Sequence, residues 1–179
     1  MDGAAARAPG ATSDGSPRRG AVPALHSRHP QLESDIKTVR DLLALKGATV
    51  VSVSPSSTVL DAAHIMGDNG FGAVLVMDGT RLVGIFTERD MLRRVVASER
   101  DPATSRVEEV MTTALFTCVP ETTADECGAI MTRHRIRHLP VVDTTGLHGL
   151  VSIGDLLAHR VREQEDTIKF LNNYMFSVR

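Results

Sequence analysis

Tryptophan is absent from this chain, and tyrosine occurs only once, at Tyr174. Charge of one sign is scarce as well, because 20 lysines and arginines stand against 22 aspartates and glutamates, for a formal net charge of −2. Surfaces that bind duplex nucleic acid are usually basic, and surfaces that bind single strands stack bases on aromatic side chains. The composition therefore gives no support to a nucleic-acid-binding protein, and we expect no nucleic acid among its partners.

Cysteine and long apolar runs are also rare. The two cysteines, Cys118 and Cys127, are too few for a disulfide-rich secreted domain and favour a reducing compartment. No apolar run approaches the roughly 18–20 residues of a transmembrane helix. The N-terminal region lacks the apolar segment of a secretory signal peptide. The sequence therefore predicts a cytoplasmic protein with no membrane partner.

Residues 1–34 differ from the rest of the chain. They are rich in alanine, glycine, proline, serine and arginine and have no apolar period, so we expect them to be disordered. Their arginines leave open a mitochondrial transit peptide, which would place the protein in the mitochondrial matrix. Asp2, Asp14 and the prolines argue against that alternative.

An internal repeat is the strongest signal in the chain. A shift of 65 residues aligns residues 55–92 with residues 120–157 without a gap. The identical pairs are Pro55/Pro120, Thr58/Thr123, Ile65/Ile130, Met66/Met131, Val76/Val141, Asp78/Asp143, Thr80/Thr145, Leu82/Leu147, Gly84/Gly149, Asp90/Asp155 and Leu92/Leu157. Two copies of one structural unit are therefore expected.

Each copy predicts the same order of elements. A β-branched run, residues 49–53 or 115–119, predicts a strand that a proline ends. Apolar residues at i, i+3, i+4 and i+7 then predict a helix after Thr58 and after Thr123. Two short strands follow, at 73–77 and 82–86 or at 138–142 and 147–151. A second helix begins at Thr87 or Ser152.

The expected fold is α+β, with two β-α-β-β-α copies. Residues 35–100 form the first repeat and residues 101–162 the second, and residues 37–45 and 107–111 serve as approach segments. One such sheet is too small to be stable alone, so the copies should pack with pseudo-two-fold symmetry around a cleft.

Residues 163–179 form a C-terminal helical extension in this prediction, continuing the last helix of the second repeat. A partial apolar stripe predicts that this helix packs on a partner subunit or back on the repeats. The stripe comprises Leu156, Leu157, Val161, Ile168, Leu171, Tyr174 and Met175.

The repeated motifs resemble those of a known family. They are PSSTVLDAAHIM and GAVLVMDGTRLVGIFTERDML in the first copy, then VEEVMTT and PETTADECGAIMTRHRIRHLPVVDTTGLHGLVSIGDLL in the second. Over about residues 37–162 the chain resembles a tandem CBS-domain pair, or Bateman module. It looks like the stand-alone type found in bacteria and plant mitochondria.

The resemblance implies a regulatory sensor and not an enzyme. Such modules usually bind an adenine nucleotide between the repeats, and AMP, ADP, ATP, NAD(H) and S-adenosylmethionine all occur in the family. They modulate a regulated protein, unknown here, and commonly form homodimers. A nucleotide-processing enzyme and a purely structural dimerisation module are the alternatives.

Two short motifs carry the candidate site. Thr87 with Asp90, and Ser152 with Asp155, fit a capping box, in which a hydroxyl and an acid three residues later satisfy free helix N–H groups. The resemblance adds a second role, in which the aspartate accepts ribose hydroxyls and the hydroxyl side chain meets phosphate. Both roles are compatible, and Asp155 is the stronger candidate.

Basic residues near these motifs are candidates for phosphate contacts. Arg137 and His138 precede a strand of the second copy, whereas the first copy has Gly72 and Ala73 there, so one dominant nucleotide site is expected. Arg89 either reaches phosphate or pairs with a neighbouring acid. Its counterpart, Gly154, would let a ligand approach the backbone.

Apolar and backbone contacts should hold the adenine, although most of these residues also fit an ordinary core. The candidates are Thr38, Val39, residues 51–53 including Val53, Met111, Thr112, residues 117–119 including Thr117 and Val119, and Pro140.

Catalytic and metal sites are not predicted. The spacing of His134 and His138 crosses a break between a helix and a strand, which disfavours a shared metal ion. No GxxxxGK[ST] loop or GxGxxG motif occurs, and no Ser-His-Asp set is identifiable. Any bound nucleotide is therefore expected to be a ligand and not a catalytic cofactor.

Overall fold

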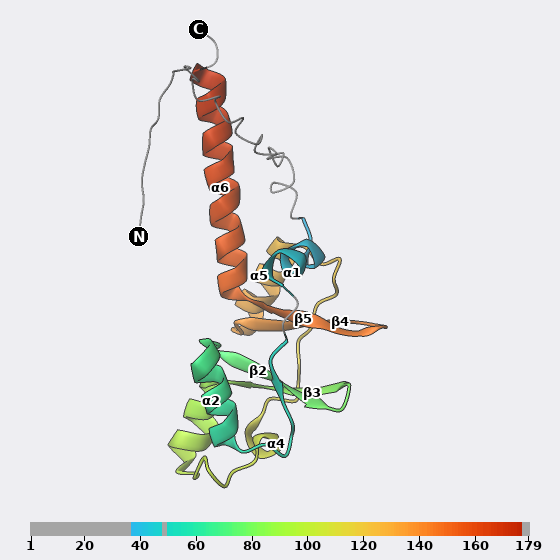
Figure 1. The fold of residues 1–179 in the computed structure, drawn as a ribbon, viewed down its shortest axis with the longest axis vertical. Coiled ribbons are helices and arrows are strands. Elements are labelled where there is room, and N and C mark those ends of the chain that lie inside the picture. The colour runs from blue at the N-terminus through green and yellow to red at the C-terminus, as the bar shows by residue number, and fades with distance from the viewer. Residues whose placement is uncertain (1–36, 48–49, 177–179) are drawn as a thin grey trace, which may run out of the picture. The chain divides into compact units, whose positions relative to one another are not determined.

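A computed structural model of the chain describes residues 37–47 and 50–176 (Figure 1). The predictions of disorder and of a transit peptide for residues 1–34 lie outside these residues, as do the last three residues of the predicted extension. Among the helices of the described ranges, none combines the length and the apolar character needed to cross a lipid bilayer.

The two copies contain equivalent β-hairpins. In the first, β2 (Ala73–Asp78) pairs antiparallel with β3 (Arg81–Thr87), and in the second β4 (His138–Asp143) pairs antiparallel with β5 (Gly146–Ser152). Both hairpins shift register at the same point, between Val76 and Met77 and between Val141 and Val142. The irregularities lie 65 residues apart, so the repeat extends to the detail of strand pairing and the predicted hairpins are confirmed.

The strands predicted before the first helix of each copy are shorter than expected. In the first copy β1 (Ser52–Val53) pairs parallel with β2 and completes a sheet of order β1-β2-β3. In the second copy the predicted strand at 115–119 is reduced to a single parallel bridge between Cys118 and Val141.

Pro140 explains why the second sheet loses this strand. In the first copy the Leu75 amide donates to the Val51 carbonyl at 3.2 Å and extends the parallel pairing. The equivalent donor in the second copy would be residue 140, and proline has no N–H group. The pairing there is limited to the bonds Cys118 N to Pro140 O at 3.1 Å and Val142 N to Cys118 O at 2.9 Å.

The first helix of each copy begins where the sequence predicts. Helices α2 (Val59–Asn69) and α5 (Ala124–His134) both start with a capping box, at Thr58 and Thr123. Both end in a left-handed residue, Gly70 with φ of 66° and Arg135 with φ of 52°. Their buried faces carry Val59, Ala62, Met66, Cys127 and Met131.

The second helices differ between the copies. After Thr87 the chain forms a short helix α3 (Glu88–Asp90), then a π-helical turn (Met91–Val95) and a 3₁₀ turn (Val96–Ser98). After Ser152 it forms α6 (Ile153–Phe176), one uninterrupted helix of 24 residues. The predicted C-terminal helical extension is therefore confirmed as far as Phe176.

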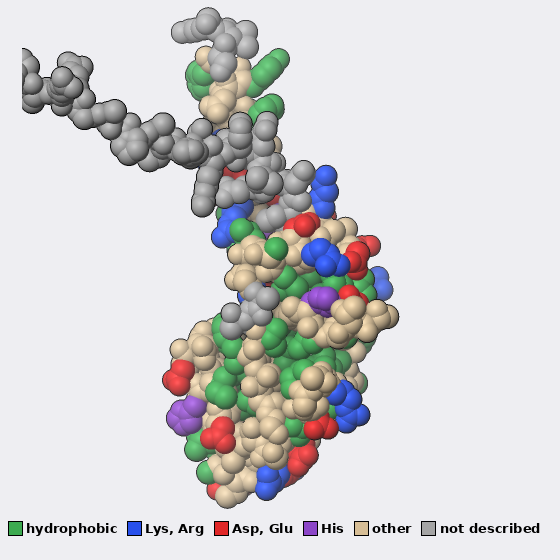
Figure 2. Space-filling view, turned by 45° about the vertical axis from the view of Figure 1, so that its right-hand side comes forward, with side chains coloured by type: hydrophobic (Ala, Val, Ile, Leu, Met, Phe, Trp, Pro, Cys, Tyr) green, Lys and Arg blue, Asp and Glu red, His purple; other side chains and the backbone are tan. Residues whose placement is uncertain are grey.

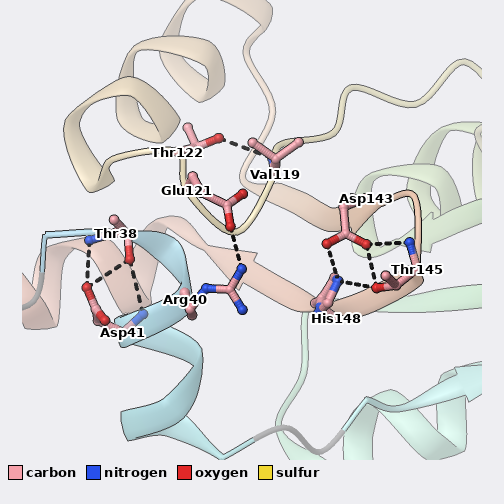
Figure 3. A network of polar contacts seen from close by, with 9 residues as sticks. All are labelled: Thr38, Arg40, Asp41, Val119, Glu121, Thr122, Asp143, Thr145 and His148. Carbon is pink, nitrogen blue, oxygen red and sulfur yellow. Dashed lines mark hydrogen bonds and ion pairs between the residues drawn. The ribbon is translucent and has the colours of Figure 1, made fainter.

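The approach segments, residues 37–45 and 107–111, form short helices, and each helix packs in the core of the other copy. We call this arrangement the helix exchange. Helix α1 (Val39–Lys46) precedes the first copy in sequence, yet Val39, Leu42 and Leu43 lie in the core of the second copy. The Val39 amide donates to the Thr122 carbonyl at 2.8 Å, and Figure 3 shows Arg40 of α1 paired with Glu121. The same view shows Thr38 and Asp41 in the capping box that starts α1.

Helix α4 (Val107–Val110) makes the reciprocal exchange. Val107 and Val110 are buried in the core of the first copy, and the Val107 amide donates to the Ser57 carbonyl at 2.9 Å. Repeat boundaries at residues 35–100 and 101–162 therefore divide the sequence, whereas each hydrophobic core takes its approach helix from the other repeat.

The two sheets face each other across a third apolar cluster. Ala73, Leu75 and Ile85 of the first copy form its buried part, packed against partly buried residues that include Leu147 and Leu150 of β5. Figure 2 shows hydrophobic side chains gathered along the junction between the copies. The expected packing of one copy on the other is therefore observed.

The helix exchange predicts a specific steric coupling. A Cβ at Gly149 of β5 would lie 2.8 Å from Cδ2 of Leu43 on α1. We expect Gly149→Ala to lower the free energy of unfolding by about 1–3 kcal/mol, the usual cost of overpacking a core. In a Leu43→Ala background the same substitution should cost clearly less, because the clash is gone.

Urea denaturation of the single and double variants measures this coupling. Gly67→Ala on α2 is the matched control, because a Cβ there meets nothing within 4 Å and alanine favours a helix. An equal cost of Gly149→Ala in both backgrounds would contradict the packing of α1 on β5.

Candidate functional site

The two candidate motifs form the same hydrogen-bonded structure. Oδ2 of Asp90 accepts from the Thr87 amide at 3.1 Å and from the Thr87 hydroxyl at 2.7 Å. Oδ2 of Asp155 accepts from the Ser152 amide and hydroxyl, both at 2.8 Å. Both motifs are thus capping boxes, and each leaves one carboxylate oxygen outside the cap.

The remaining oxygen of Asp90 already has partners. Its Oδ1 accepts from the Thr112 hydroxyl at 2.9 Å and lies 3.6 Å from Nε of Arg94. The Arg94 guanidinium also donates to the carbonyls of Val110 and Met111 at the end of α4. Asp90 is only 7% exposed. A ligand would therefore have to displace an existing interaction to reach this carboxylate.

Asp155 is more accessible and has a cationic neighbour. Nζ of Lys46, at the end of α1, lies 2.7 Å from Oδ2 and 3.3 Å from the Leu150 carbonyl. Burial alone would raise the pKa of the Asp155 carboxyl, but the hydrogen bonds from Lys46 and Ser152 outweigh it and hold that pKa below its usual value. Among the described residues no hydrogen bond reaches Oδ1 of Asp155. This oxygen is free to accept from a ligand.

A pocket of about 140 Å³ lies beside Ser152 and Lys46. Its apolar walls come from Val50, Val51 and Phe71 of the first copy and from Leu150 of the second. The remaining lining residues are Gly70, Gly72, Ala73 and His138. Ligand pockets usually measure roughly 300–1,000 Å³, so this one accommodates only part of a nucleotide.

His138 and Lys46 are the titratable residues among those that line the pocket, and His138 has a shifted pKa. Burial, with a smaller contribution from the Arg137 charge, lowers the pKa of its imidazole. The ring is therefore neutral at neutral pH and offers a hydrogen bond, whereas the sequence alone suggested a positive charge at this position.

Arg137 points to a different neighbour. Its guanidinium forms an ion pair with Glu88, which follows Thr87 in the first copy, at 3.0 Å. A Cβ at Gly72 would lie 3.2 Å from the same Glu88 carboxylate and 3.5 Å from the His138 ring. Gly72, Glu88, Arg137 and His138 thus meet where the copies join, with the Arg137 charge compensated by Glu88.

Arg89 does not form the expected ion pair with Glu88 or Asp90. Its guanidinium donates to the Arg135 carbonyl at the end of α5, which ties the start of α3 to the second copy. Gly154 has open space beside it, since a Cβ there would meet only the Ser152 hydroxyl, at 3.6 Å.

Most of the other residues predicted to contact adenine serve the cores and caps. Val39, Val53 and Pro140 are buried, Thr38 caps α1, and Met111 packs against Gly84. Thr112 contacts Asp90, Thr117 is exposed, and Val119 is exposed beside Thr122. Of the predicted segments, only residue 51 lines the pocket together with His138 and Ser152.

Sequence reasoning missed Lys46, Val50, Phe71 and Leu150. Lys46 could not be placed because α1 belongs spatially to the second copy, which no local pattern reveals. The pocket also combines residues 70–73 of the first copy with Ser152 of the second. The small residues Gly72 and Ala73 therefore line the same pocket as His138 and Ser152.

Metal and thiol chemistry lack a constellation in the described part of the chain. No group of three or more histidine, cysteine, aspartate or glutamate side chains there could hold a metal ion. His134 stacks on Phe116 with ring centroids 3.7 Å apart. Cys118 and Cys127 are buried in the core of the second copy.

Comparisons with known proteins identify the family of this chain. The family model "CBS domain" matches residues 38–97 and 107–162. The mitochondrial CBS domain-containing protein CBSX3 of Arabidopsis thaliana is 34% identical over 147 residues, which cover 77% of this chain and 71% of that protein.

Solved structures share the fold. A protein with CBS domains from Burkholderia ambifaria is 45% identical with a TM-score of 0.68, covering 71% of this chain and 96% of the other. The CBS-domain pair of protein MJ0100, in complex with 5′-methylthioadenosine and S-adenosyl-L-methionine, is 24% identical with a TM-score of 0.60. That match covers 68% of this chain and 97% of the other, and shows likeness of fold alone.

The lowered pKa of His138 predicts a pH-dependent stability. Because the folded state disfavours protonation of this ring, the unfolded state binds more protons below the ordinary histidine pKa of about 6.5. Stability should therefore fall as the pH drops from 7.5 to 5, and His138→Gln should remove part of that loss. Urea midpoints across this range, with His64→Gln on the exposed surface of α2 as the control, measure it. Parallel pH profiles of His138→Gln and wild type would contradict the assignment.

Proposed function

Because the chain belongs to the CBS-domain family, whose paired domains are regulatory modules, we propose that it is a sensor of an adenine nucleotide. The ligand binds in the pocket beside Ser152, Lys46 and Asp155, and binding changes the affinity for a regulated protein. The module acts by binding and not by catalysis. Its compartment is the cytoplasm, or the mitochondrial matrix in the case that residues 1–34 are a transit peptide.

The observation that carries the proposal is the combination of groups at this pocket. The unoccupied Oδ1 of Asp155 suits the paired hydroxyls of a ribose, because a carboxylate accepts two hydrogen bonds. The Lys46 ammonium, 2.7 Å from the same carboxylate, suits a phosphate. Val50, Val51, Phe71 and Leu150 supply apolar surface for a purine ring. Each part of a nucleotide thus has a group of matching chemistry in this pocket or, for Asp155, hydrogen-bonded to the lining residues Lys46 and Ser152.

The Lys46–Asp155 ion pair gives the ligand a structural effect. A nucleotide that takes Asp155 with its ribose and Lys46 with its phosphate replaces a direct link between α1 and α6 by a bridge through the ligand. A ligand shifts an equilibrium only when one arrangement binds it better. Separation of the two side chains is the change that the bound state favours, because it also enlarges a pocket of about 140 Å³.

One site dominates in this proposal. Asp90 lies in the equivalent position, but its carboxylate is engaged by Thr112 and Arg94 and is almost fully buried. A second nucleotide would have to break these contacts before gaining its own. Titration calorimetry should therefore give one tight site per chain, and two equal tight sites would contradict this asymmetry.

Ligand-induced thermal shifts test the site. The panel is AMP, ADP, ATP, NAD⁺, NADH, S-adenosylmethionine and adenosine, each measured against the same variant without ligand. Asp155→Asn should raise the dissociation constant of the ligand about 10–100-fold, since a hydrogen bond to a charged group contributes roughly 1.5–3 kcal/mol. The ligand-induced rise in Tm should fall accordingly by mass action.

Matched variants separate binding from helix capping. Asp61→Asn removes the equivalent capping acid from α2, away from the pocket, and should leave the ligand shift intact. Lys46→Met should lower the affinity for AMP and ATP and leave the affinity for adenosine unchanged, because in this proposal only the phosphates contact the ammonium. Ligand shifts that survive Asp155→Asn and Lys46→Met unchanged would place the site elsewhere.

A further inference from the structure

The C-terminal half of α6 has no buried side chain. Leu156 and His159 are the buried residues of this helix, and from Arg160 to Phe176 every residue is at least partly exposed. Figure 1 shows this half of α6 extending beyond α5 and α1, with no other described element packed along it. Figure 2 shows hydrophobic side chains exposed toward its C-terminal end.

Such a segment needs stabilisation from outside the two repeats. A short isolated helix is only marginally stable in water, and most helical stability in proteins comes from the packing of an apolar face. Residues 160–176 form exposed ion pairs, Lys169 with Asp166 at 3.2 Å and Arg160 with Asp125 of α5 at 3.9 Å, but such exposed pairs contribute little. Burial of the apolar side chains against a partner would supply the missing stability.

The exposed apolar residues follow a heptad pattern. Positions 157, 161, 164, 168, 171 and 175 are spaced alternately by four and three residues, the period of a coiled-coil seam. The residues are Leu157, Val161, Gln164, Ile168, Leu171 and Met175, and we call them the α6 seam. Its apolar members are 51% to 70% exposed.

The α6 seam lies on the other side of the helix from its buried residues. With Val161 and Ile168 at position a of the heptad, the buried residues Leu156 and His159 fall at positions c and f. These positions lie on the opposite side of the helix from a and d. One face of α6 therefore packs on the module, and the seam is exposed, although its first residue, Leu157, also lines a groove beside α5.

We propose that the α6 seam pairs with the same seam of a second copy of this chain in a parallel, in-register, two-stranded coiled coil. β-Branched residues at position a, here Val161 and Ile168, combined with leucine at position d, here Leu157 and Leu171, favour parallel dimers. The arrangement is a two-fold interface in which each residue meets its own counterpart.

Charge supports the parallel orientation. Position g of one helix faces the following position e of the other in a parallel pair, and these positions hold Arg160 and Glu165. The two copies would therefore form two opposite-charge contacts at the rim of the seam. An antiparallel pair sets g against g and e against e, which loses this complementarity.

Gln164 at position d fixes the register of the proposed coiled coil and lowers its stability. A polar residue in a coiled-coil core fixes register at a cost in stability. The seam is also short, so the dimer should depend on protein concentration. This interface is separate from the nucleotide pocket, and its test does not depend on the proposed function.

Cysteine cross-linking of the full chain tests the pairing. In a parallel, in-register pair the two residues at position 168 meet, so Ile168→Cys should form a covalent dimer under oxidised glutathione at least tenfold faster than Phe170→Cys. Phe170 is the matched control, because it is 70% exposed on the same helix but at position c, outside the seam. The native cysteines are buried and should not interfere.

Sedimentation velocity over a concentration series is the second test, and it measures the dimer dissociation constant. Gln164→Leu should lower the dimer dissociation constant at least tenfold, because it replaces the polar core residue by leucine. Equal cross-linking rates at positions 168 and 170 would overturn the proposal, whatever dimers form through other faces. A monomer in which residues 1–36 cover the seam would also overturn it, showing neither cross-linking at position 168 nor an effect of Gln164→Leu on mass.

Discussion

The exchange of the approach helices is the contact on which the rest of this structure depends. Val39, Leu42 and Leu43 of α1 complete the core of the second copy, and Val107 and Val110 of α4 complete the core of the first. Neither core is closed without a segment from the other repeat, so the two should fold as one cooperative unit. Two close contacts mark the exchange, Leu43 against Gly149 and Met111 against Gly84, and both glycines occupy the same position of the repeat. A side chain at either position would force Leu43 or Met111 to shift.

The helix exchange also determines which side chain contacts each capping aspartate. The end of α1 brings an ammonium, Lys46, to Asp155, whereas the residues after α4 bring a hydroxyl, Thr112, to Asp90. An ammonium on a flexible stem can move to a phosphate and leave the carboxylate to a ribose. The Thr112 hydroxyl is held close to its backbone, whose amide and carbonyl both bond to Ile85, so Asp90 keeps its partner. Two motifs that are nearly identical in sequence thus acquire different chemistry from residues that are distant in sequence.

The sequence predicted what is local or repeated, and it missed what depends on the exchange. Thr58, Thr87, Thr123 and Ser152 were identifiable because a capping box needs only a hydroxyl and an acid three residues later, and the hairpins followed from short apolar runs. The loss of the strand at 115–119 could also have been predicted from the sequence, since Pro140 lacks the backbone N–H that Leu75 provides in the first copy. Lys46 and Leu150 carried no such signal, because their place in the pocket follows from which core α1 joins. Arg137 and Arg89 were attractive phosphate ligands by type, but Glu88 and the Arg135 carbonyl are within their reach only in three dimensions.

The two ends of α6 connect the pocket with the seam. Its first turn carries Asp155, its next turn is anchored by Leu156 and His159, and its remaining length presents the α6 seam. Because α6 is uninterrupted over 24 residues, a rotation or tilt that a ligand causes at Asp155 also moves Val161 and Ile168. The equivalent helix of the first copy cannot transmit motion in this way, since a π-helical turn begins directly after Asp90 and a 3₁₀ turn ends it at Ser98. The more accessible aspartate therefore belongs to a helix that reaches beyond the two repeats, so the proposed ligand binding and the proposed pairing of copies would share a single uninterrupted helix.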